Sequence, residues 1–426
     1  MKKILNSKFF LAVFLLFLIR FVFAFLIYHP DVRNHVDWGI RFFEYGPSKF
    51  YAPESNVWSY TWPNQPPGSI LIYAFVRKLY EALYSFFWFL NTSIPLFPSN
   101  LMYGIEHNLY PSLLQLPAII ADGGIALLIY KILKRIKDTK TGQYGALLFL
   151  LNPVIWYNSA IWGQTDSIVN FFVLLAFYFV YKKKLFFSIL SFAISLYIKV
   201  SLAVFAPIFL LILFKKYKVI DILKYSIVVF GIILLITLPF SVGSGKDPIS
   251  FLVYLYQEKV LTEQLQVITA NAFNLWATLT GIHERPHSLP LLGLTYQFWG
   301  YILFGFLFFP IFYSLWKKEN EKKTYFVIAL TAFISWMFLT NMHERYLYPL
   351  FPYLTIIAAL NLTLIPIYWL ISIVNLLNLY NFWWYPEISV VKQFLSFGDR
   401  LMPRVFGVVN LGIFILIYKK FFKNIL

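Results

Sequence analysis

Long apolar segments separated by short basic clusters restrict this chain to one structural class. The first segment, from about Phe9 to Tyr28, is interrupted only by Arg20, and its length of about 20 residues is enough for a helix to cross a bilayer. Comparable segments follow along the whole chain, and only 13% of residues are charged, against roughly one quarter in soluble domains. The sequence therefore predicts an all-α, polytopic integral membrane protein built as one module, residues 1–426.

The basic clusters also predict the orientation of the chain. The formal net charge of +17 lies in clusters between apolar segments, a pattern typical of topology signals rather than of a nucleic-acid-binding face. The first segment lacks a small-residue cleavage site, so we expect a membrane helix and not a signal peptide. Placing the clusters in the cytoplasm gives a cell-membrane protein with both termini cytoplasmic and about twelve spans. The expected spans are Phe9–Tyr28, Pro111–Leu133, Tyr144–Tyr157, Asp166–Tyr181, Leu185–Ile198, Ser201–Phe214, Ile222–Phe240, Tyr296–Trp316, Tyr325–Thr340, Leu347–Leu364, Ile367–Trp384 and Phe406–Tyr418.

Two long external loops are expected, residues 29–110 and 241–293. Within the first loop, Ser69–Leu90 is apolar, but counting it as a span would invert every later loop against the positive-inside rule. We therefore expect this segment to lie on the outer leaflet. Spans such as Leu185–Ile198, with about 14 residues, are shorter than a bilayer requires, which implies local thinning or a water-filled cavity.

Ionisable residues gather on the outer side of this topology. The stretch from His29 to Gly68 is the densest in Asp, His, Arg, Trp and paired Pro. It could form a site for chemistry on a half-buried substrate, or it could be a solvated loop whose charges only mark the membrane boundary. One-sided clustering favours an external active site, because a transporter places ionisable groups near the midplane. Asp122, in the second expected span, is interpreted as a structural carboxylate bonded to a neighbouring helix.

Two groups of basic residues suggest an anion site. Lys199 lies where two short spans meet, and it either reaches the lipid headgroups or faces a pocket that holds a lipid phosphate. His343, Glu344 and Arg345 could form an inert polar turn, but a His and an Arg at the same membrane face as Lys199 favour anion binding.

Other chemistry is limited by what the sequence lacks. It has no cysteine, no His or Asp cluster with metal-ligand spacing and no glycine-rich nucleotide loop. We therefore expect no metal and no cofactor. Four tryptophans lie among the polar candidates and could stack on a sugar ring: Trp38, Trp58, Trp62 and Trp162.

Several motifs resemble those of GT-C type membrane glycosyltransferases that use polyprenyl-phosphate sugars. The segment from Asp31 through Trp38 resembles the first external loop of the dolichyl-phosphate-glucose glucosyltransferases, whose matching aspartate is the catalytic base. HERYLYP is similar to bacterial and archaeal relatives of the second mannosyltransferase of GPI-anchor synthesis. Asn64 and Gln65 replace acidic and aromatic residues of the glucosyltransferases, and the chain after Pro352 matches no known block. The blocks in order are the Asp31 loop, NQPPG, LLNPVIWYNSAIWGQTDS, SLYIKVSLAVFAP, ITANAFNLW and NMHERYLYP.

The resemblance implies inverting, metal-independent transfer of a hexose, mannose or glucose, from a polyprenyl-phosphate donor to a glycan or glycolipid acceptor at the outer face. Asp31 would be the general base, and Lys199, His343 and Arg345 would hold the donor phosphate. The implied substrate-binding residues are Asp37, Trp38, Gln164, Asp166 and Glu344.

Two other functions remain open at this point. A lipid-linked oligosaccharide polymerase or ligase would share the span count and the outer loops with Arg and His. A lipid-linked sugar flippase or other transporter belongs to a different class, and the lack of internal repeats and of midplane charges counts against it.

Overall fold

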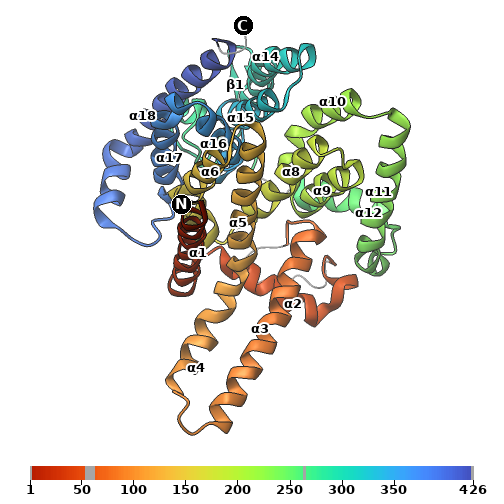
Figure 1. Ribbon diagram of the computed structural model, residues 1–426, viewed down its shortest axis with the longest axis vertical. Helices are drawn as coiled ribbons and strands as arrows, with labels where there is room; N and C mark the ends of the chain where they lie inside the picture. Colours follow the sequence, from red (N-terminus) through yellow and green to blue (C-terminus); the bar gives the residue numbers. More distant parts are fainter. Residues whose placement is uncertain (1, 53–62, 262–264, 424–426) are drawn as a thin grey trace.

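The computed structural model describes residues 2–52, 63–261 and 265–423, and nearly all of its regular structure is helical (Figure 1). The first helices are α1 Lys2–Leu26, α2 Val32–Lys49, α3 Pro67–Ser93, α4 Asn100–Gly104, α5 Tyr110–Ile136, α6 Thr139–Leu150, α7 Pro153–Ala160, α8 Asp166–Tyr181 and α9 Leu185–Ile198. They are followed by α10 Ala206–Lys216, α11 Val219–Ser241, α12 Pro248–Tyr254, α13 Leu275–Thr280, α14 Tyr296–Lys317, α15 Glu321–Phe338, α16 Leu350–Leu360, α17 Ile365–Tyr380 and α18 Ser389–Lys423.

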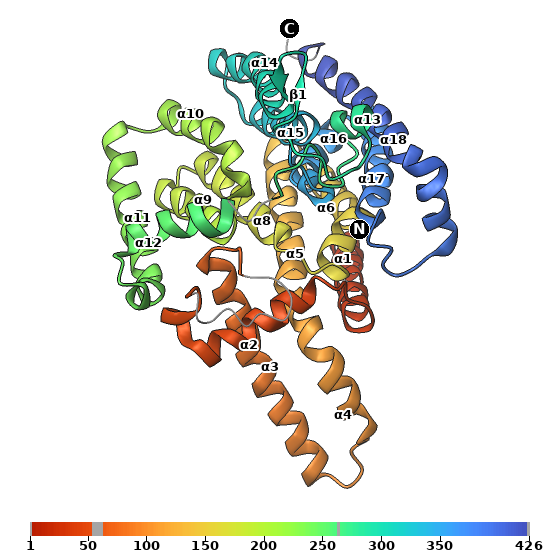
Figure 2. The ribbon, with the colours of Figure 1, turned by 180° about the vertical axis from the view of Figure 1, so that it is seen from behind.

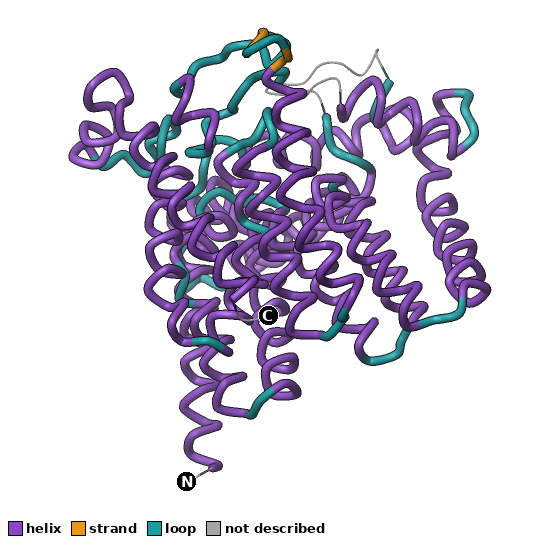
Figure 3. The backbone as a smooth tube through the Cα atoms, turned by 90° about the horizontal axis from the view of Figure 1, so that it is seen from above, coloured by secondary structure: helices purple, strands orange, loops and turns teal. Residues whose placement is uncertain are grey.

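Short elements connect these helices. The 3-10 turns are η3 Val200–Phe205, η4 Val242–Ser244, η6 Glu344–Leu347 and η7 Leu362–Leu364, and the π-helical turns are η2 Ile105–Leu109 and η5 Leu255–Leu261. Strands β1 Pro290–Leu291 and β2 Leu294–Thr295 pair antiparallel. In Figure 3 these strands lie at one edge of the molecule and the N-terminus lies at the opposite edge.

Six helical segments among the described residues are long and apolar enough to cross a membrane, which supports the predicted polytopic all-α class. They are Lys8–Leu26, Asn100–Ile136, Val219–Ser244, Tyr296–Lys317, Leu362–Tyr380 and Ser389–Lys423. The helices α8 and α9 are apolar but shorter. The expected total of about twelve spans therefore stays a prediction.

Two expected spans differ from the observed helices. The segment expected from Tyr144 to Tyr157 is broken between α6 and α7, because Pro153 cannot continue the preceding helix. Asn152 instead caps α7, its side chain accepting a hydrogen bond from the N–H of Val154 at 3.0 Å. The helix expected from Pro111 begins earlier, because α4 and the π-helical turn η2 lead directly into α5. The π-helical turn lies next to Pro111, which has no backbone N–H to donate to the preceding turn.

Helix α3 and the neighbouring helix that begins with α4 project together from the rest of the molecule (Figures 1 and 2). Arg77 on α3 packs over the ring of Tyr110, with 5.2 Å between the guanidinium carbon and the ring centroid. Several outward-facing side chains on α3 are apolar: Phe75 is 70% exposed and Phe89 is 61% exposed. This surface suits the expected position of the segment on a lipid leaflet.

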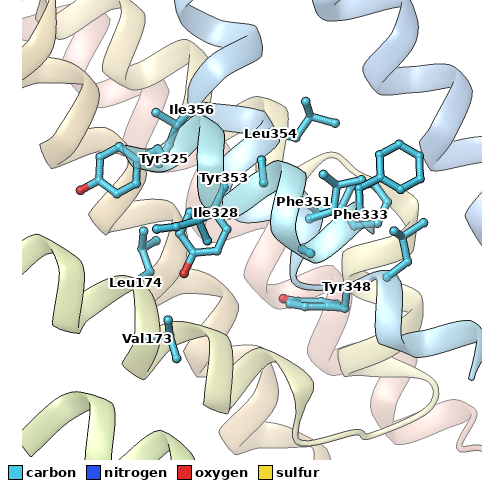
Figure 4. Packing of buried hydrophobic residues seen from close by; sticks show 14 of the residues in the cluster. Val173, Leu174, Tyr325, Ile328, Phe333, Tyr348, Phe351, Tyr353, Leu354 and Ile356 are labelled. Atoms are coloured by element: carbon cyan, nitrogen blue, oxygen red, sulfur yellow. The ribbon is translucent and has the colours of Figure 1, made fainter. Parts of the chain in front are cut away.

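The core lies around α15 and α16, whose residues are buried on almost every side. Figure 4 shows Tyr325, Phe351 and Tyr353 in one buried cluster that also contains Val173 and Leu174 of α8. A helix that is apolar all round belongs in the centre of a bundle, and these two helices therefore form the support for the loops at their ends.

A buried ion pair joins α1 to α5. Arg20 lies 3.1 Å from Asp122 and also donates to the carbonyl of Leu150 at 2.6 Å. The Asp122 carboxylate further accepts hydrogen bonds from Ser167 at 2.7 Å and from Tyr348 at 2.8 Å. Asp122 is thus buried and bonded to neighbouring helices, as the sequence analysis expects.

Removal of Asp122 should destabilise the fold strongly. Asp122→Ala leaves the Arg20 guanidinium unpaired in the apolar interior, so we expect a loss of about 3 to 5 kcal/mol in the free energy of unfolding. Denaturant unfolding in detergent, followed by tryptophan fluorescence, measures this loss.

Glu81→Ala is the matched control, because Glu81 pairs with Arg77 at 2.9 Å on the partly exposed surface of α3. This change should cost less than about 1 kcal/mol. Equal losses in the two variants would contradict the structural role of the buried pair.

Candidate active site

A cavity of about 860 Å³ gathers residues from several separate connections, among them those that follow α1, α7, α9, α15 and α17. Every one of these connections carries a polar or aromatic side chain into the same space. The lining includes Asp31, Gln164, Lys199, His343, Glu344, Arg345 and Trp383. Most of the candidates that the sequence predicts for the outer side of the membrane therefore meet in one cavity.

Asp31 lies at the N-terminus of α2, and its side chain makes no capping hydrogen bond to that helix. One carboxylate oxygen, Oδ2, accepts hydrogen bonds from Trp162 Nε1 at 2.9 Å and from Gln164 Nε2 at 3.2 Å. The nearest basic atom to the other oxygen, Oδ1, is His29 Nδ1 at 3.9 Å. One oxygen is thus fixed and the second accepts no hydrogen bond from the described residues, so it can take a proton.

His29 holds the backbone of Asp31 in place. Its ring is fully buried between Trp162 and Trp383, each with a centroid separation of 4.6 Å. Nδ1 accepts a hydrogen bond from the backbone N–H of Asp31 at 3.1 Å, which assigns the ring proton to Nε2. Burial lowers the pKa of His29 to about 4, so His29 is a neutral group that fixes the backbone of Asp31.

Lys199 is the first cation of the cavity. It follows the last residue of α9 in extended backbone geometry, which turns its side chain away from the helix axis. Its Nζ donates to Asp166 Oδ1 at 3.0 Å and lies 5.4 Å from the ring centroid of Tyr346. The second oxygen of Asp166 is buried and has no partner among the described residues. The pair is therefore oriented but keeps bonding capacity for a ligand.

Arg345 is the second cation. Its Nη1 lies 3.3 Å from the carboxylate of Glu344, and its guanidinium carbon lies 5.7 Å from the ring centroids of both Trp162 and Tyr346. Burial opposes the charge, but the attraction of Glu344 and other nearby groups outweighs it and raises the pKa of Arg345 above its usual range. Arg345 thus stays protonated in the cavity.

His343 lines the same cavity beside both cations. Its carbonyl accepts a hydrogen bond from Trp336 Nε1 at 3.0 Å, which anchors its backbone to α15. Burial, together with Arg345 and Lys199, lowers the pKa of His343 well below its usual value. His343 can therefore give the site a hydrogen bond but not a positive charge at neutral pH.

The other predicted substrate-binding residues are divided. Trp38, Gln164 and Glu344 line the cavity, and Asp166 reaches it through Lys199. Asp37 is not among the lining residues: it accepts a hydrogen bond from Arg41 Nε at 3.3 Å, one turn further along α2. Its substrate-binding role stays a prediction.

Two of the predicted tryptophans, Trp58 and Trp62, fall outside the described residues. Within the described ranges no group of three or more His, Asp or Glu side chains could hold a metal ion. The expectation of metal-independent chemistry stays a prediction.

The sequence analysis did not identify Phe382 and Trp383, which also line the cavity. They belong to an aromatic run, FWWY, that directly follows an apolar helix. Such a run is typical of an interfacial aromatic belt, and no local pattern shows that it folds back onto a loop near the N-terminus.

A second, apolar cavity of about 550 Å³ lies between α9 and α11. Its lining includes Leu196, Tyr197, Phe230 and Tyr256, and Tyr256 donates a hydrogen bond to the carbonyl of Leu196 at 3.2 Å. Tyr197 lines this apolar groove, and Lys199, two residues further along the chain, lines the polar cavity.

These features define a helical membrane fold with one polar cavity and one apolar groove. A search of solved structures finds a similar fold in the crystal structure of ArnT from Cupriavidus metallidurans bound to undecaprenyl phosphate. The match has a TM-score of 0.54 and 13% sequence identity, and it covers 97% of this chain and 73% of the ArnT chain. The two chains thus share a fold, while the resemblance to GT-C glycosyltransferases and to mannosyltransferases stays a prediction. Protein-family models and curated proteins gave no match.

Stability should fall as the pH is lowered, because buried neutral histidines cannot protonate in the folded state. Burial lowers the pKa of His35 from 6.5 to about 4. Between these values the unfolded chain binds more protons, so stability is lost as pH falls from 6.5 towards 4. His35 alone should account for about 3 kcal/mol of this loss.

His35→Phe keeps a ring against Tyr73, on which His35 stacks at 4.4 Å, and should flatten the dependence of the unfolding midpoint on pH. The control is His107→Phe, because His107 is exposed but stacks in the same way on Tyr103, at 4.2 Å. An unchanged pH profile in His35→Phe would show that His35 does not titrate on unfolding.

Proposed function

We propose that the protein is a glycosyltransferase that transfers a hexose, mannose or glucose, from a polyprenyl-phosphate donor to a glycan or glycolipid acceptor at the outer face of the membrane. The observation that carries this proposal is that Asp31, with one carboxylate oxygen that accepts no hydrogen bond from the described residues, lines the same cavity as the cations Lys199 and Arg345. A separate apolar groove includes Tyr197, two residues before Lys199. ArnT, which shares the fold, is bound to undecaprenyl phosphate in its crystal structure.

The donor fits the two cavities in a defined way. Its isoprenoid chain would occupy the apolar groove between α9 and α11, and its phosphate would lie at Lys199 and Arg345. Negative charge grows on this phosphate as the bond to the sugar breaks, and two fixed cations in a partly desolvated site stabilise it without a proton donor. His343 adds a hydrogen bond to the phosphate.

Asp31 would act as the general base of the reaction. An acceptor hydroxyl oxygen forms the new bond to the anomeric carbon while the bond between that carbon and the phosphate oxygen breaks. Oδ1 of Asp31 takes the hydroxyl proton. Trp162 and Gln164 hold Oδ2, which leaves Oδ1 as the oxygen that would take the proton. Attack from the face opposite the phosphate inverts the anomeric configuration.

Product formation separates this function from transport. Full-length protein in liposomes is supplied with undecaprenyl-phosphate [¹⁴C]mannose or glucose and with membrane glycolipids. A transferase places label in a new glycosidic bond and releases undecaprenyl phosphate, whereas a flippase moves the donor without cleaving it.

Asp31→Asn should remove most of this transfer. Asparagine keeps the size and hydrogen bonding of the side chain but takes no proton, so the transfer rate should fall by about 10² to 10⁴ while donor binding remains. Asp37→Asn is the matched control, because Asp37 lies on the same helix but contacts Arg41, and it should fall less. Near-normal transfer by folded Asp31→Asn would refute the assigned base.

The two cations should govern donor use. Arg345→Ala and Lys199→Ala should each cost about 2 to 4 kcal/mol in kcat/KM for the donor, the range for losing one preorganised charge-stabilising contact. Arg345→Lys should recover only part of the loss, because a lysine cannot form the planar fork of a guanidinium. Unchanged donor kinetics in either alanine variant would return that residue to a packing or snorkelling role.

A further inference from the structure

The connection between α17 and α18 forms an aromatic wall of the catalytic cavity. Phe382 and Trp383 both line that cavity, and Phe382 is 54% exposed. Trp383 packs edge-on against Trp162, with ring centroids 5.6 Å apart, and against His29 at 4.6 Å. Both of these neighbours contact Asp31, so the wall directly adjoins the proposed base.

The backbone of this wall is held in an unfavourable conformation. Phe382 has φ of 77° and Trp384 has φ of 52°, the left-handed region that bulky aromatic residues rarely adopt. Such conformations persist where surrounding contacts impose them, and they concentrate at functional sites.

Contacts at both ends of the segment impose this conformation. Asn381 and Asn271 exchange two hydrogen bonds: Asn271 Nδ2 donates to the Asn381 carbonyl at 2.9 Å, and Asn381 Nδ2 donates to Asn271 Oδ1 at 2.6 Å. At the other end, Tyr157 donates its hydroxyl to the carbonyl of Tyr385. The aromatic wall is therefore fixed in place before any substrate arrives.

A series of ring contacts links the wall to the first donor cation, with other side chains between them. Lys199 lies over Tyr346, Arg345 lies over both Tyr346 and Trp162, and Trp162 packs against Trp383. Lys199 and Trp383 thus stand at opposite ends of this series, and Trp162, which binds Asp31, lies between them. In an inverting reaction the acceptor and the leaving phosphate lie on opposite sides of the anomeric carbon, so the end at Trp383 suits the acceptor.

The chemistry of the wall suits a saccharide. A sugar ring presents an apolar C–H face and a rim of hydroxyl groups, and aromatic side chains with adjacent polar groups complement both. Arg400 and Glu284 line the same cavity and provide a hydrogen-bond donor and an acceptor. The simpler alternative is an interfacial anchor in lipid, which does not account for a fixed position beside Asp31.

We propose that Phe382 and Trp383 form the acceptor subsite and that the acceptor group is a saccharide, whose ring packs on these aromatic side chains while its hydroxyl group faces Asp31. This inference rests on the proposed glycosyltransferase function. It also gives the C-terminal helices a role, because α17 and α18 carry the subsite.

The test measures saccharide binding separately from donor binding. Full-length protein in nanodiscs is titrated with mannobiose, maltotriose and chitotriose as probes, and saturation-transfer NMR reports contact with their ring protons. At least one probe should bind, and Phe382→Ala should weaken it about fivefold or more. Undecaprenyl phosphate binding should stay unchanged in the variant.

Phe306→Ala is the matched control, because Phe306 on α14 is 75% exposed and lies outside the cavity lining; it should leave saccharide binding unchanged. Trp383→Phe, which keeps an aromatic ring, should weaken binding less than Trp383→Leu. Equal saccharide binding by Phe382→Ala and unmodified protein would overturn the subsite. So would the absence of binding by all probes in protein that binds undecaprenyl phosphate, and in both cases the proposed donor chemistry would stand. Failure of unmodified, folded protein to bind undecaprenyl phosphate would overturn the proposed function and this inference with it.

Discussion

The geometry of the catalytic cavity depends on one buried carboxylate, Asp122. In an apolar interior an ionised group is stable only when it is paired and hydrogen-bonded, and Asp122 meets this need with partners from three other segments: Arg20, Ser167 and Tyr348. Each partner belongs to a segment that also carries a residue of the site. Arg20 belongs to the helix that leads to Asp31, Ser167 follows Asp166, and Tyr348 closely follows Arg345. The requirement to satisfy one charge therefore sets where these three segments meet.

Charge pairing continues in the cavity itself. Lys199 is held by Asp166 and Arg345 lies beside Glu344, so each cation is oriented by a carboxylate on a neighbouring position. Such preorganisation lowers the cost of reorganising charges when a substrate charge develops. The two histidines nearest to Asp31 and Arg345, His29 and His343, have lowered pKa values, and their neutrality keeps further positive charge away from the base and the cations.

The helical membrane class could be predicted from the sequence. Asp31, Lys199 and Arg345 could be singled out because each follows an apolar helix, and such positions lie at helix ends. The structure brings these three residues to one cavity, while their roles stay predictions. The rest depends on contacts between distant segments. Trp383 meets His29 only after the last helices fold back, and the aromatic run that contains it has the composition of an ordinary membrane belt. Asp37 has a local pattern similar to that of Asp31, but its carboxylate bonds to Arg41 and it does not line the cavity. Spacing along the chain does not predict this difference.

The groove between α9 and α11 has a consequence for how substrate reaches the protein. Ile227 lines this groove and is 70% exposed on α11, so the groove opens sideways. Under the proposed function, a lipid donor that enters here would diffuse in two dimensions within the leaflet and would not cross bulk water. Its effective concentration is its mole fraction among lipids. Dilution of the membrane with detergent or carrier lipid would then lower the transfer rate, just as removal of donor would. The total amount of donor in the sample would be unchanged.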